Sequence, residues 1–388
     1  MEKKKHLIFT VTNDLVYDQR MQRICVAMAE EGYRVTLVGR LLPNSPPLAN
    51  YPFEQIRIPC RFTKGKAFYI EYNYKLHQYL IKQSADAFCA IDLDTIIPVL
   101  LVSKKLGIPR MYDAHEYFTE MIEVKRRPLI HFLWSKVEQW AVPQFTHGYT
   151  VGGFIALELE KKYKVHYKVV RNMASRIIID AGYKMPDALN AILLMANTKS
   201  NPGLPVILYQ GALNEGRALI PLLQAMCEVE GRLFIAGSGN METKVKESIK
   251  ILHLENKVIL LGNIAPAHLK YLTHLCYCGI TIFDDASLNQ YYSLGNKFFD
   301  YIMAHKPQVC VNYPEYQAIL KQYPVALPLS DVKPASISAA LNKMIKNPVL
   351  YSNLVSNTKK AAAILNWDNE KQILFDAWKE LLTLSQKK

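Results

Sequence analysis

Short apolar runs alternate with longer amphipathic runs along the sequence, and this alternation constrains the fold more than any other feature. Near the N-terminus, an apolar run at 7–11 precedes helical spacing at 19–31, then Gly32, then a second apolar run at 34–38. A strand, a helix and a strand in this order form a βαβ unit, whose two strands lie parallel in one sheet. The same order returns at 87–112, at 148–170 and across 206–311. The chain is therefore predicted to be an α/β protein built on parallel sheets.

The rhythm is interrupted once, at about 174–203, by turn-forming sequence such as Ser200-Asn-Pro-Gly203. A chain of 388 residues, half of them apolar, is too long for one core and suits two domains. We expect an N-terminal domain at 1–180, a C-terminal domain at 204–365 and a final helical segment at 366–388. Two such domains in tandem place a cleft between the carboxyl ends of their strands, so binding residues are expected in the loops that follow strands.

The charge and the cysteines limit the environment and the partners. The net charge of +13 favours anionic partners, which include nucleotide diphosphates, anionic lipid headgroups and nucleic acid. The seven cysteines form no Cys-x-x-Cys pair, which indicates reduced thiols in the cytoplasm. No run of about 18 apolar residues is present, so no transmembrane helix is expected. No nucleic-acid-binding module is recognised, and we do not expect a nucleic acid partner.

One segment has the features of an anion site. Residues 289–301 (Asn-Gln-Tyr-Tyr-Ser-Leu-Gly-Asn-Lys-Phe-Phe-Asp-Tyr) follow the apolar run at 279–282 and open a helix. The start of that helix would offer free backbone N–H groups and the positive end of its dipole to a diphosphate. Lys297 adds a full charge, and Asp300 could accept hydrogen bonds from a ribose. The spacing alone equally suits an ordinary amphipathic helix with Phe298 and Phe299 in the core.

Residues 293–307 (Ser-Leu-Gly-Asn-Lys-Phe-Phe-Asp-Tyr-Ile-Met-Ala-His-Lys-Pro) resemble the donor-binding signature of the retaining glycosyltransferases of family 4, within the group 1 glycosyl transferases. The resemblance covers nearly the whole chain. It implies the GT-B architecture, in which two Rossmann-like parallel-sheet domains face an interdomain cleft and a C-terminal helix crosses back to the N-terminal domain. It also implies transfer of a sugar from a UDP-, GDP- or dTDP-sugar to a hydroxyl, with retention of anomeric configuration.

The resemblance also assigns a donor site in the C-terminal half. Residues 209–217 resemble the family's strand and loop with a diphosphate-binding arginine, here Arg217, and 234–239 resemble its second glycine turn. Arg217 and Lys297 would stabilise the charge of the leaving diphosphate. The expected donor-binding residues are Gly211, Gly237, Ile264, Asn289, Tyr292, Ser293, Leu294, Asn296 and Asp300. The sequence departs from the family pattern where Tyr292 replaces an acid and where Gly295, Asp300 and His305 replace Pro, Glu and Gly. Asp284 or Asp285 could supply the missing carboxylate.

In the N-terminal half, Tyr112-Asp-Ala-His-Glu116 resembles the family's histidine loop, so His115 is the third catalytic candidate. Residues around this loop and the first strand are expected on the acceptor side: Asp14, Asp18, Arg20, Asp113 and Glu116. For Asp18, capping of the following helix is the alternative.

Neither a metal nor a cofactor is expected. The Asp92-Leu-Asp94 pair has the spacing of a metal motif but lies in the N-terminal half, away from the donor segment. By analogy, the acceptor belongs to surface polysaccharide or lipid-linked glycan synthesis at the cytoplasmic face. Two basic aromatic segments, 61–69 and 125–136, suit either an anionic membrane surface or ordinary packed helices. A nucleotide-sugar 2-epimerase and a non-catalytic nucleotide-sugar-binding subunit remain as alternative functions.

Overall fold

The computed structural model describes residues 4–176, 186, 190 and 203–384, and most of the expected linker at 174–203 lies outside them. The chain divides into two compact units. The N-terminal unit comprises residues 1–172, 287–289 and 370–388, and the C-terminal unit comprises residues 173–286 and 290–369. The division falls at 172/173 and 369/370, so residues 173–203 are grouped with the C-terminal unit, and the domain bounds expected at 180, 204 and 366 stay predictions. The expectation did not include the short segment 287–289, which is grouped with the N-terminal unit.

The N-terminal unit is built on a seven-stranded parallel sheet with the order β3-β2-β1-β4-β5-β6-β7. The central strands β1 and β4 are fully buried, as expected where helices cover both faces of a parallel sheet. The sheet contains β1 (His6–Thr10), β2 (Arg34–Leu41), β3 (Glu54–Pro59), β4 (Ala87–Ile91), β5 (Arg110–Ala114), β6 (Gly148–Thr150) and β7 (Lys168–Val169).

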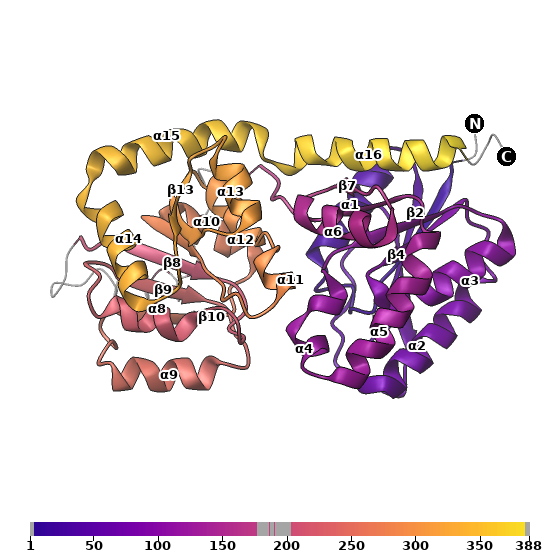
Figure 1. Cartoon of the computed structure of the whole chain (residues 1–388), viewed down its shortest axis with the longest axis horizontal. Coiled ribbons are helices and arrows are strands. Elements are labelled where there is room, and N and C mark those ends of the chain that lie inside the picture. The colour runs from indigo at the N-terminus through magenta and orange to yellow at the C-terminus, as the bar shows by residue number, and fades with distance from the viewer. Residues whose placement is uncertain (1–3, 177–185, 187–189, 191–202, 385–388) are drawn as a thin grey trace. The chain divides into compact units, whose positions relative to one another are not determined.

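Helices connect and cover these strands (Figure 1). They are α1 (Gln19–Glu30), α2 (Gly65–Leu80), α3 (Ile96–Leu106), α4 (Ile122–Lys125), α5 (Pro128–Ala141), α6 (Gly153–Tyr163) and α16 (Trp367–Leu384). Most of α16 belongs to this unit, because Trp378 is fully buried with its ring centroid 5.2 Å from that of Phe9 on β1. The prediction that the last helix packs on the N-terminal sheet is therefore confirmed.

The C-terminal unit repeats the plan with a six-stranded parallel sheet, order β10-β9-β8-β11-β12-β13. Its strands are β8 (Val206–Gln210), β9 (Arg232–Ala236), β10 (Val258–Gly262), β11 (Cys278–Thr281), β12 (Gln308–Val311) and β13 (Ala326–Leu329). Its helices are α8 (Leu219–Met226), α9 (Glu242–Ile251), α10 (Pro266–Leu275), α11 (Leu288–Tyr291), α12 (Asn296–Met303), α13 (Pro314–Leu320), α14 (Pro334–Lys346) and α15 (Pro348–Ile364).

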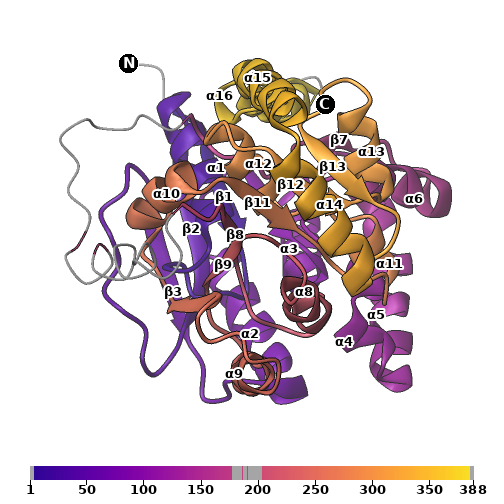
Figure 2. The ribbon, with the colours of Figure 1, turned by 90° about the vertical axis from the view of Figure 1, so that its left-hand side faces the viewer.

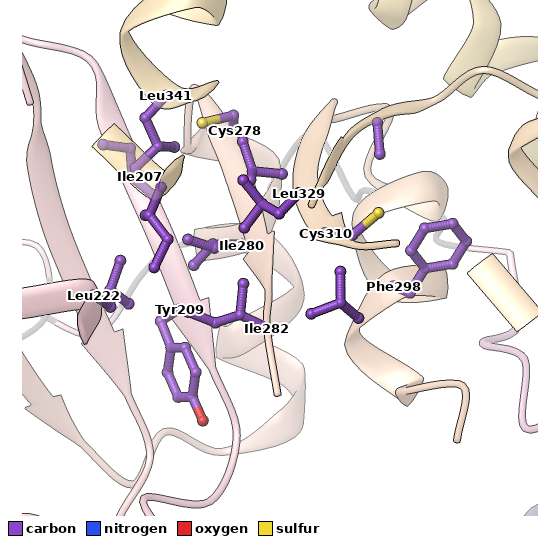
Figure 3. Close-up of a cluster of buried hydrophobic side chains, with 14 of the residues drawn as sticks. Ile207, Tyr209, Leu222, Cys278, Ile280, Ile282, Phe298, Cys310, Leu329 and Leu341 are labelled. Atoms are coloured by element: carbon purple, nitrogen blue, oxygen red, sulfur yellow. The ribbon is translucent and has the colours of Figure 1, made fainter. Parts of the chain in front are cut away.

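The two faces of this second sheet carry cores of unequal size. Ile207 and Tyr209 of β8 join a large cluster with α8, α12 and α14 (Figure 3). Leu208, which lies between them, joins a small cluster with α10. Figure 2 shows α10 on one side of the sheet and α8 and α14 on the other. This alternation along β8 is the period of two expected for a strand covered on both faces.

The α/β class with two parallel sheets, predicted from the sequence, is confirmed. The prediction missed strands β3 and β13, helices α2 and α13, and the short helices α4 and α11. Strand β3 (Glu-Gln-Ile-Arg-Ile-Pro) lies at the edge of the sheet and is only partly buried, so it lacks a continuous apolar run. Helix α2 mixes aromatic and basic residues without a clear apolar stripe. Both segments singled out as basic and aromatic prove to contribute helices, α2 and α5.

Candidate functional site

The strand order of the C-terminal sheet reverses at β8, which pairs with β9 on one side and β11 on the other. Open α/β sheets bind ligands at such a switch point, beside the carboxyl ends of the strands. The loop after β8 and the loop after β11 meet here. The Asp284 N–H donates to the Gly216 carbonyl oxygen (3.1 Å), and Gln290 Nε2 donates to the same oxygen (3.3 Å).

A cavity of about 290 Å³ lies at the carboxyl ends of β8, β9 and β10. It is lined by Gly211, Ala212, Ala236, Gly237, Ser238, Asn263, Ile264 and Leu269. Gly237 has a φ of +147°, and a Cβ atom there would lie 2.0 Å from the Gly211 carbonyl oxygen. Glycine is thus required where the two loops approach each other. The predicted residues Gly211, Gly237 and Ile264 all line this one cavity.

Lys297 lies in the first turn of α12, and its side chain is buried beside Gly211. Only 9% of Lys297 is exposed, and a Cβ atom on Gly211 would lie 3.7 Å from its Nζ. The Nζ atom lies 3.8 Å from the centroid of the Tyr209 ring and 5.3 Å from that of Phe283. Within the described part of the chain, this ammonium group has no hydrogen-bond partner.

Arg217 brings a second positive charge to the same place. Its Cζ atom lies 4.8 Å from the centroid of the Phe283 ring, so this one ring contacts both cations. Burial lowers the pKa of Lys297 well below its usual value, the Arg217 charge lowers the pKa further, and Asp300 opposes both effects. An anion bound here would relieve this unfavourable state, because it would neutralise two neighbouring positive charges.

Asp300 lies one turn beyond Lys297. Its Oδ2 accepts a hydrogen bond from Gln210 Nε2 (2.9 Å) at the end of β8, and Gln210 Oε1 accepts one from the Thr273 hydroxyl (2.7 Å). The carboxylate is therefore held at the carboxyl end of β8, next to the glycine that lines the cavity.

The backbone before α12 differs from the expectation. The Ser293 N–H donates to the Gln290 carbonyl (3.2 Å), and the Gly295 N–H donates to the Tyr316 hydroxyl (2.9 Å). The prediction of free backbone N–H groups at the start of this helix was therefore wrong for Ser293 and Gly295. The helix dipole and Lys297 remain as the attraction for an anion at this end.

The other predicted donor residues lie around this loop. Leu294 is buried, Asn296 is exposed at the first position of α12, and Tyr292 is half-buried with its ring 5.5 Å from that of Tyr291. Asn289 is grouped with the N-terminal unit, whereas the other predicted donor residues lie in the C-terminal unit. Asp284 and Asp285 follow Phe283 directly, and Asp284 is half-buried whereas Asp285 is exposed.

In the N-terminal unit, His115 follows β5 and is held by its neighbours. Its Nε2 lies 2.8 Å from Oδ2 of the fully buried Asp113, whose Oδ1 lies 3.3 Å from an Arg20 nitrogen. Burial and the Arg20 charge lower the pKa of His115, but the charge and hydrogen bond of Asp113 together with the Asp92 charge outweigh them and raise it. Burial would raise the pKa of Asp113, but His115 and Arg20 together lower it. Arg20 is also buried and donates to the Val170 carbonyl (3.1 Å). Of His115, Asp113 and Arg20, only His115 is therefore partly exposed.

Asp92 is a residue whose role the sequence reasoning missed. Its Oδ1 accepts hydrogen bonds from the backbone N–H groups of His115 (2.8 Å) and Glu116 (3.2 Å). Burial raises the pKa of Asp92 to about 8, although His115 opposes the rise. Asp94 accepts a hydrogen bond from the Thr12 hydroxyl (2.7 Å). The sequence carries a signal for this role, because Asp92 is an acid that directly follows the buried strand β4.

The remaining acceptor-side candidates are mostly internal. Asp18 caps α1, because its Oδ1 accepts the Met21 N–H (3.1 Å), as the alternative interpretation had it. Asp14 is buried and pairs with Arg57 (3.6 Å). Glu116 alone of the five predicted residues is exposed.

Comparisons with known proteins agree with this architecture. The family model described as "Glycosyl transferases group 1" matches residues 193–361, whereas no curated protein matches the sequence. Sucrose-phosphate synthase from Thermosynechococcus elongatus is similar in structure, with a TM-score of 0.78 and 13% identity over 98% of this chain and 100% of that one. HepE from Anabaena, solved in complex with UDP-glucose, gives a TM-score of 0.73 and 12% identity over 97% and 100%. WaaG, a glycosyltransferase involved in lipopolysaccharide biosynthesis, gives 0.67 and 13% over 96% and 98%. Among the described residues, no helix is long and apolar enough to cross a membrane.

Proposed function

We propose that this chain, which has the GT-B fold and carries a group 1 glycosyl transferase domain at 193–361, moves a sugar from a nucleotide-sugar donor to a hydroxyl. One observation carries the proposal. The buried ammonium of Lys297 lies with Arg217 on the Phe283 ring, beside a glycine-lined cavity at the switch point of the sheet. A nucleoside diphosphate supplies the negative charge that this pair of cations lacks, and the cavity offers room for the nucleoside.

The reaction breaks the bond between the anomeric carbon and the diphosphate oxygen and forms a bond from that carbon to the acceptor oxygen. Negative charge grows on the leaving diphosphate, so cations fixed in place before the reaction stabilise the transition state more than the ground state. Arg217 and Lys297 are the residues for this role. We propose retention of configuration, with the acceptor attacking from the face that the leaving group vacates and its proton passing to the departing diphosphate oxygen.

We also propose that the donor site works without a metal ion. Two side-chain cations stand where a diphosphate would otherwise need a divalent ion for charge neutralisation. Full turnover in excess chelator is the expected result, and loss of turnover that is restored by a divalent cation would overturn this part of the proposal.

His115 is proposed to contact the transferred sugar or its phosphate from the N-terminal unit, with Asp113 and Arg20 fixing its ring. Ion pairing of Asp113 also bears on the epimerase alternative. That reaction needs carboxylates free to exchange protons, for which Asp113 and Glu116 were the candidates; Asp113 is fully buried between Arg20 and His115, which leaves only the exposed Glu116. Transfer to an acceptor is therefore the reaction that the site favours.

The acceptor is proposed to be a growing surface polysaccharide or a lipid-linked glycan, used at the cytoplasmic face of a membrane. The donor is proposed to be a UDP-sugar first, since the structurally similar HepE binds UDP-glucose, with GDP- and dTDP-sugars next.

A thermal-shift panel over UDP-, GDP-, ADP- and dTDP-sugars tests the donor site, because a ligand that binds only the folded state raises the melting temperature. The proposal predicts a shift of about 2.7 kcal/mol in stability at a ligand concentration of 100 times Kd. Incubation of the bound donor with lipid-linked and polysaccharide acceptors then distinguishes transfer from epimerisation and from binding alone. Donor binding without any product would favour the non-catalytic subunit.

A further inference from the structure

Asp92, which directly follows β4, has a backbone conformation that residues other than glycine rarely adopt. Its φ is +52° and its ψ is −176°. Backbone outliers of this kind persist only where the surrounding structure holds them, and they cluster at functional sites. A hydrogen bond from the Asp92 N–H to the Asp113 carbonyl on β5 (2.9 Å) holds this one. The strained backbone places an aspartate side chain at the carboxyl end of the sheet.

One oxygen of this side chain fixes the loop that carries His115. Asp92 Oδ1 accepts both the N–H of His115 (2.8 Å) and the N–H of Glu116 (3.2 Å). Asp113 fixes the ring of the same histidine, because its Oδ2 lies 2.8 Å from Nε2. Among the described residues, the other ring nitrogen, Nδ1, has no hydrogen-bond partner. Asp92 thus sets the backbone of His115, Asp113 sets its ring, and Nδ1 is left for a ligand.

The surroundings of Asp92 differ from those of Asp113. Asp113 pairs with Arg20 and His115, whereas Asp92 makes no ion pair within the described part of the chain. The titratable groups that interact with Asp92 are mainly acidic, with one histidine among them: Asp94, Glu116, Asp113, Tyr112 and His115. Like charges and burial both disfavour an ionised carboxyl group.

Asp92 is consequently a neutral acid at neutral pH. Burial raises its pKa to about 8, and the neighbouring carboxylates add to this effect while His115 opposes it. A neutral acid can still hold the loop, because its carbonyl oxygen accepts the two N–H groups while its proton sits on the other oxygen. That other oxygen, Oδ2, accepts no hydrogen bond from the described residues.

We propose that Asp92 is a positioning residue for the transfer reaction and that it holds His115 in place as a neutral carboxylic acid. The inference rests on the proposed function, since Asp92 acts through His115 and contacts no substrate itself. A neutral anchor suits a site that receives an anionic donor, because it fixes the loop without adding a negative charge beside Asp94 and Glu116.

Two substitutions separate a neutral anchor from a charged one. Asparagine tolerates a left-handed φ and keeps an oxygen that accepts both N–H groups, but it cannot ionise. Asp92→Asn should therefore keep kcat within about twofold of the wild type at pH 7. Asp92→Gly relieves the backbone and removes both hydrogen bonds. It should lower kcat about 10- to 100-fold by misplacing His115, with little change in the KM for the donor.

The ring of His115 gives a second measurement, which needs no substrate. In the wild type, the NMR signals of this ring should show an inflection near pH 8 besides their own titration, because Asp92 then loses its proton and a negative charge appears beside the ring. Asp92→Asn should abolish this inflection. An anchor that served stability alone would not produce it.

Asp376→Asn is the matched control, because Asp376 is exposed on the part of α16 that belongs to the same unit. This control should change neither kcat nor the titration of His115. Every variant should keep the thermal shift produced by UDP, which depends on the donor site and not on the histidine loop.

Three results would overturn the inference. The first is a loss of at least about tenfold in kcat in Asp92→Asn at pH 7, because the anchor would then have to be charged. The second is an unchanged kcat in Asp92→Gly, and the third is a His115 titration without the inflection near pH 8. If Asp92→Gly does not fold, the asparagine variant and the titration still decide. A wild type that transfers no sugar would refute the proposed function instead, and the titration would test Asp92 independently.

Discussion

Replacement of Lys297 by methionine is expected to stabilise the ligand-free protein and to abolish most of its activity. Methionine keeps the apolar stem that packs on Tyr209 and Phe283 but removes the buried ammonium, which makes no hydrogen bond within the described residues. An unsatisfied buried polar group costs about 1–3 kcal/mol. Contacts between a cation and aromatic rings return about 0.5–2 kcal/mol. The free energy of unfolding should therefore rise by about 1 kcal/mol, which for a unit of this size raises Tm by about 2–4 °C.

The same substitution should lower turnover and UDP affinity, although it raises stability. Loss of one fixed positive group that faces the developing charge should lower turnover about 100- to 1,000-fold. UDP affinity should fall about tenfold or more, since a charged hydrogen bond contributes about 1.5–3 kcal/mol. Differential scanning fluorimetry with and without UDP, and steady-state kinetics, measure the two effects on one preparation. Lys321→Met, at an exposed lysine at the end of α13, is the matched control and should change neither quantity appreciably.

The pH dependence gives an independent check on the same reasoning. The folded protein holds the pKa of Lys297 well below 10.5, the ordinary value. Between the lowered pKa and 10.5 the unfolded chain binds more protons, so wild-type stability rises with pH there relative to Lys297→Met. The stability advantage of the variant should thus shrink as the pH rises through this window. If the ligand-free variant melts below the wild type, the buried ammonium of Lys297 does not destabilise the free protein. If the variant keeps wild-type turnover, that ammonium does not act on a diphosphate. Either result would refute the reasoning.

Three further substitutions test other parts of the two sites. Gly237→Ala should lower both Tm and UDP affinity, because its Cβ would lie 2.0 Å from the Gly211 oxygen; unchanged UDP affinity in calorimetry would contradict the placement of the cavity. His305→Gly should raise the free energy of unfolding by about 0.5–1 kcal/mol in urea titrations, because His305 has a left-handed φ of +57° that glycine adopts without strain; a loss of stability would show that its side chain matters more than its backbone. Asp113→Asn should lower the pKa of His115 measured by NMR, because burial and Arg20 then act without the opposing carboxylate. In the wild type, the stability due to protonated His115 is present below its ordinary pKa of 6.5 and is lost as the pH rises through its raised pKa, and an unchanged titration in the variant would rule out the pairing.

The fold was largely predictable because buried parallel strands read as continuous apolar runs. Strands β4, β9 and β12 lie within the predicted alternation at 87–112 and across 206–311. Edge strand β3 was not predictable in this way, since one side of it meets no neighbouring strand and its sequence stays half polar. Local sequence signals therefore specify the centre of each sheet better than its edge.

The candidate site was predictable to the extent that it depends on loops after strands. Gly211 and Gly237 were assigned to such loops and line one cavity, and Lys297, assigned from the start of a helix, lies beside Gly211. Contacts between residues distant in sequence were not predictable. Tyr209 and Phe283 each lie against Lys297, but nothing in their own neighbourhoods indicates that the two rings share one ammonium group.

Burial of charge was the other failure of local reasoning. Arg20 was expected on the acceptor side, and the structure shows it buried in an ion pair with Asp113, 93 positions away, which local sequence did not indicate. Sequence alone identifies a charged residue after a strand. The fold decides whether that residue faces a ligand or neutralises a partner.

The unequal cores of the C-terminal sheet bear on which of the helices that cover it opens most easily by local unfolding. Helix α10 rests on the small cluster of Leu208, Phe234, Ala236, Leu272, Cys276 and Tyr301, whereas α8 and α14 rest on the large one. Segments with few buried apolar contacts open locally at a lower free energy than the rest of a protein. Leu269 of α10 also lines the cavity, so the wall of the pocket belongs to the part of the sheet that opens most easily. Ligand binding should therefore slow amide hydrogen exchange in α10 and change it little in α8. Exchange in α10 would then report whether the cavity holds a ligand.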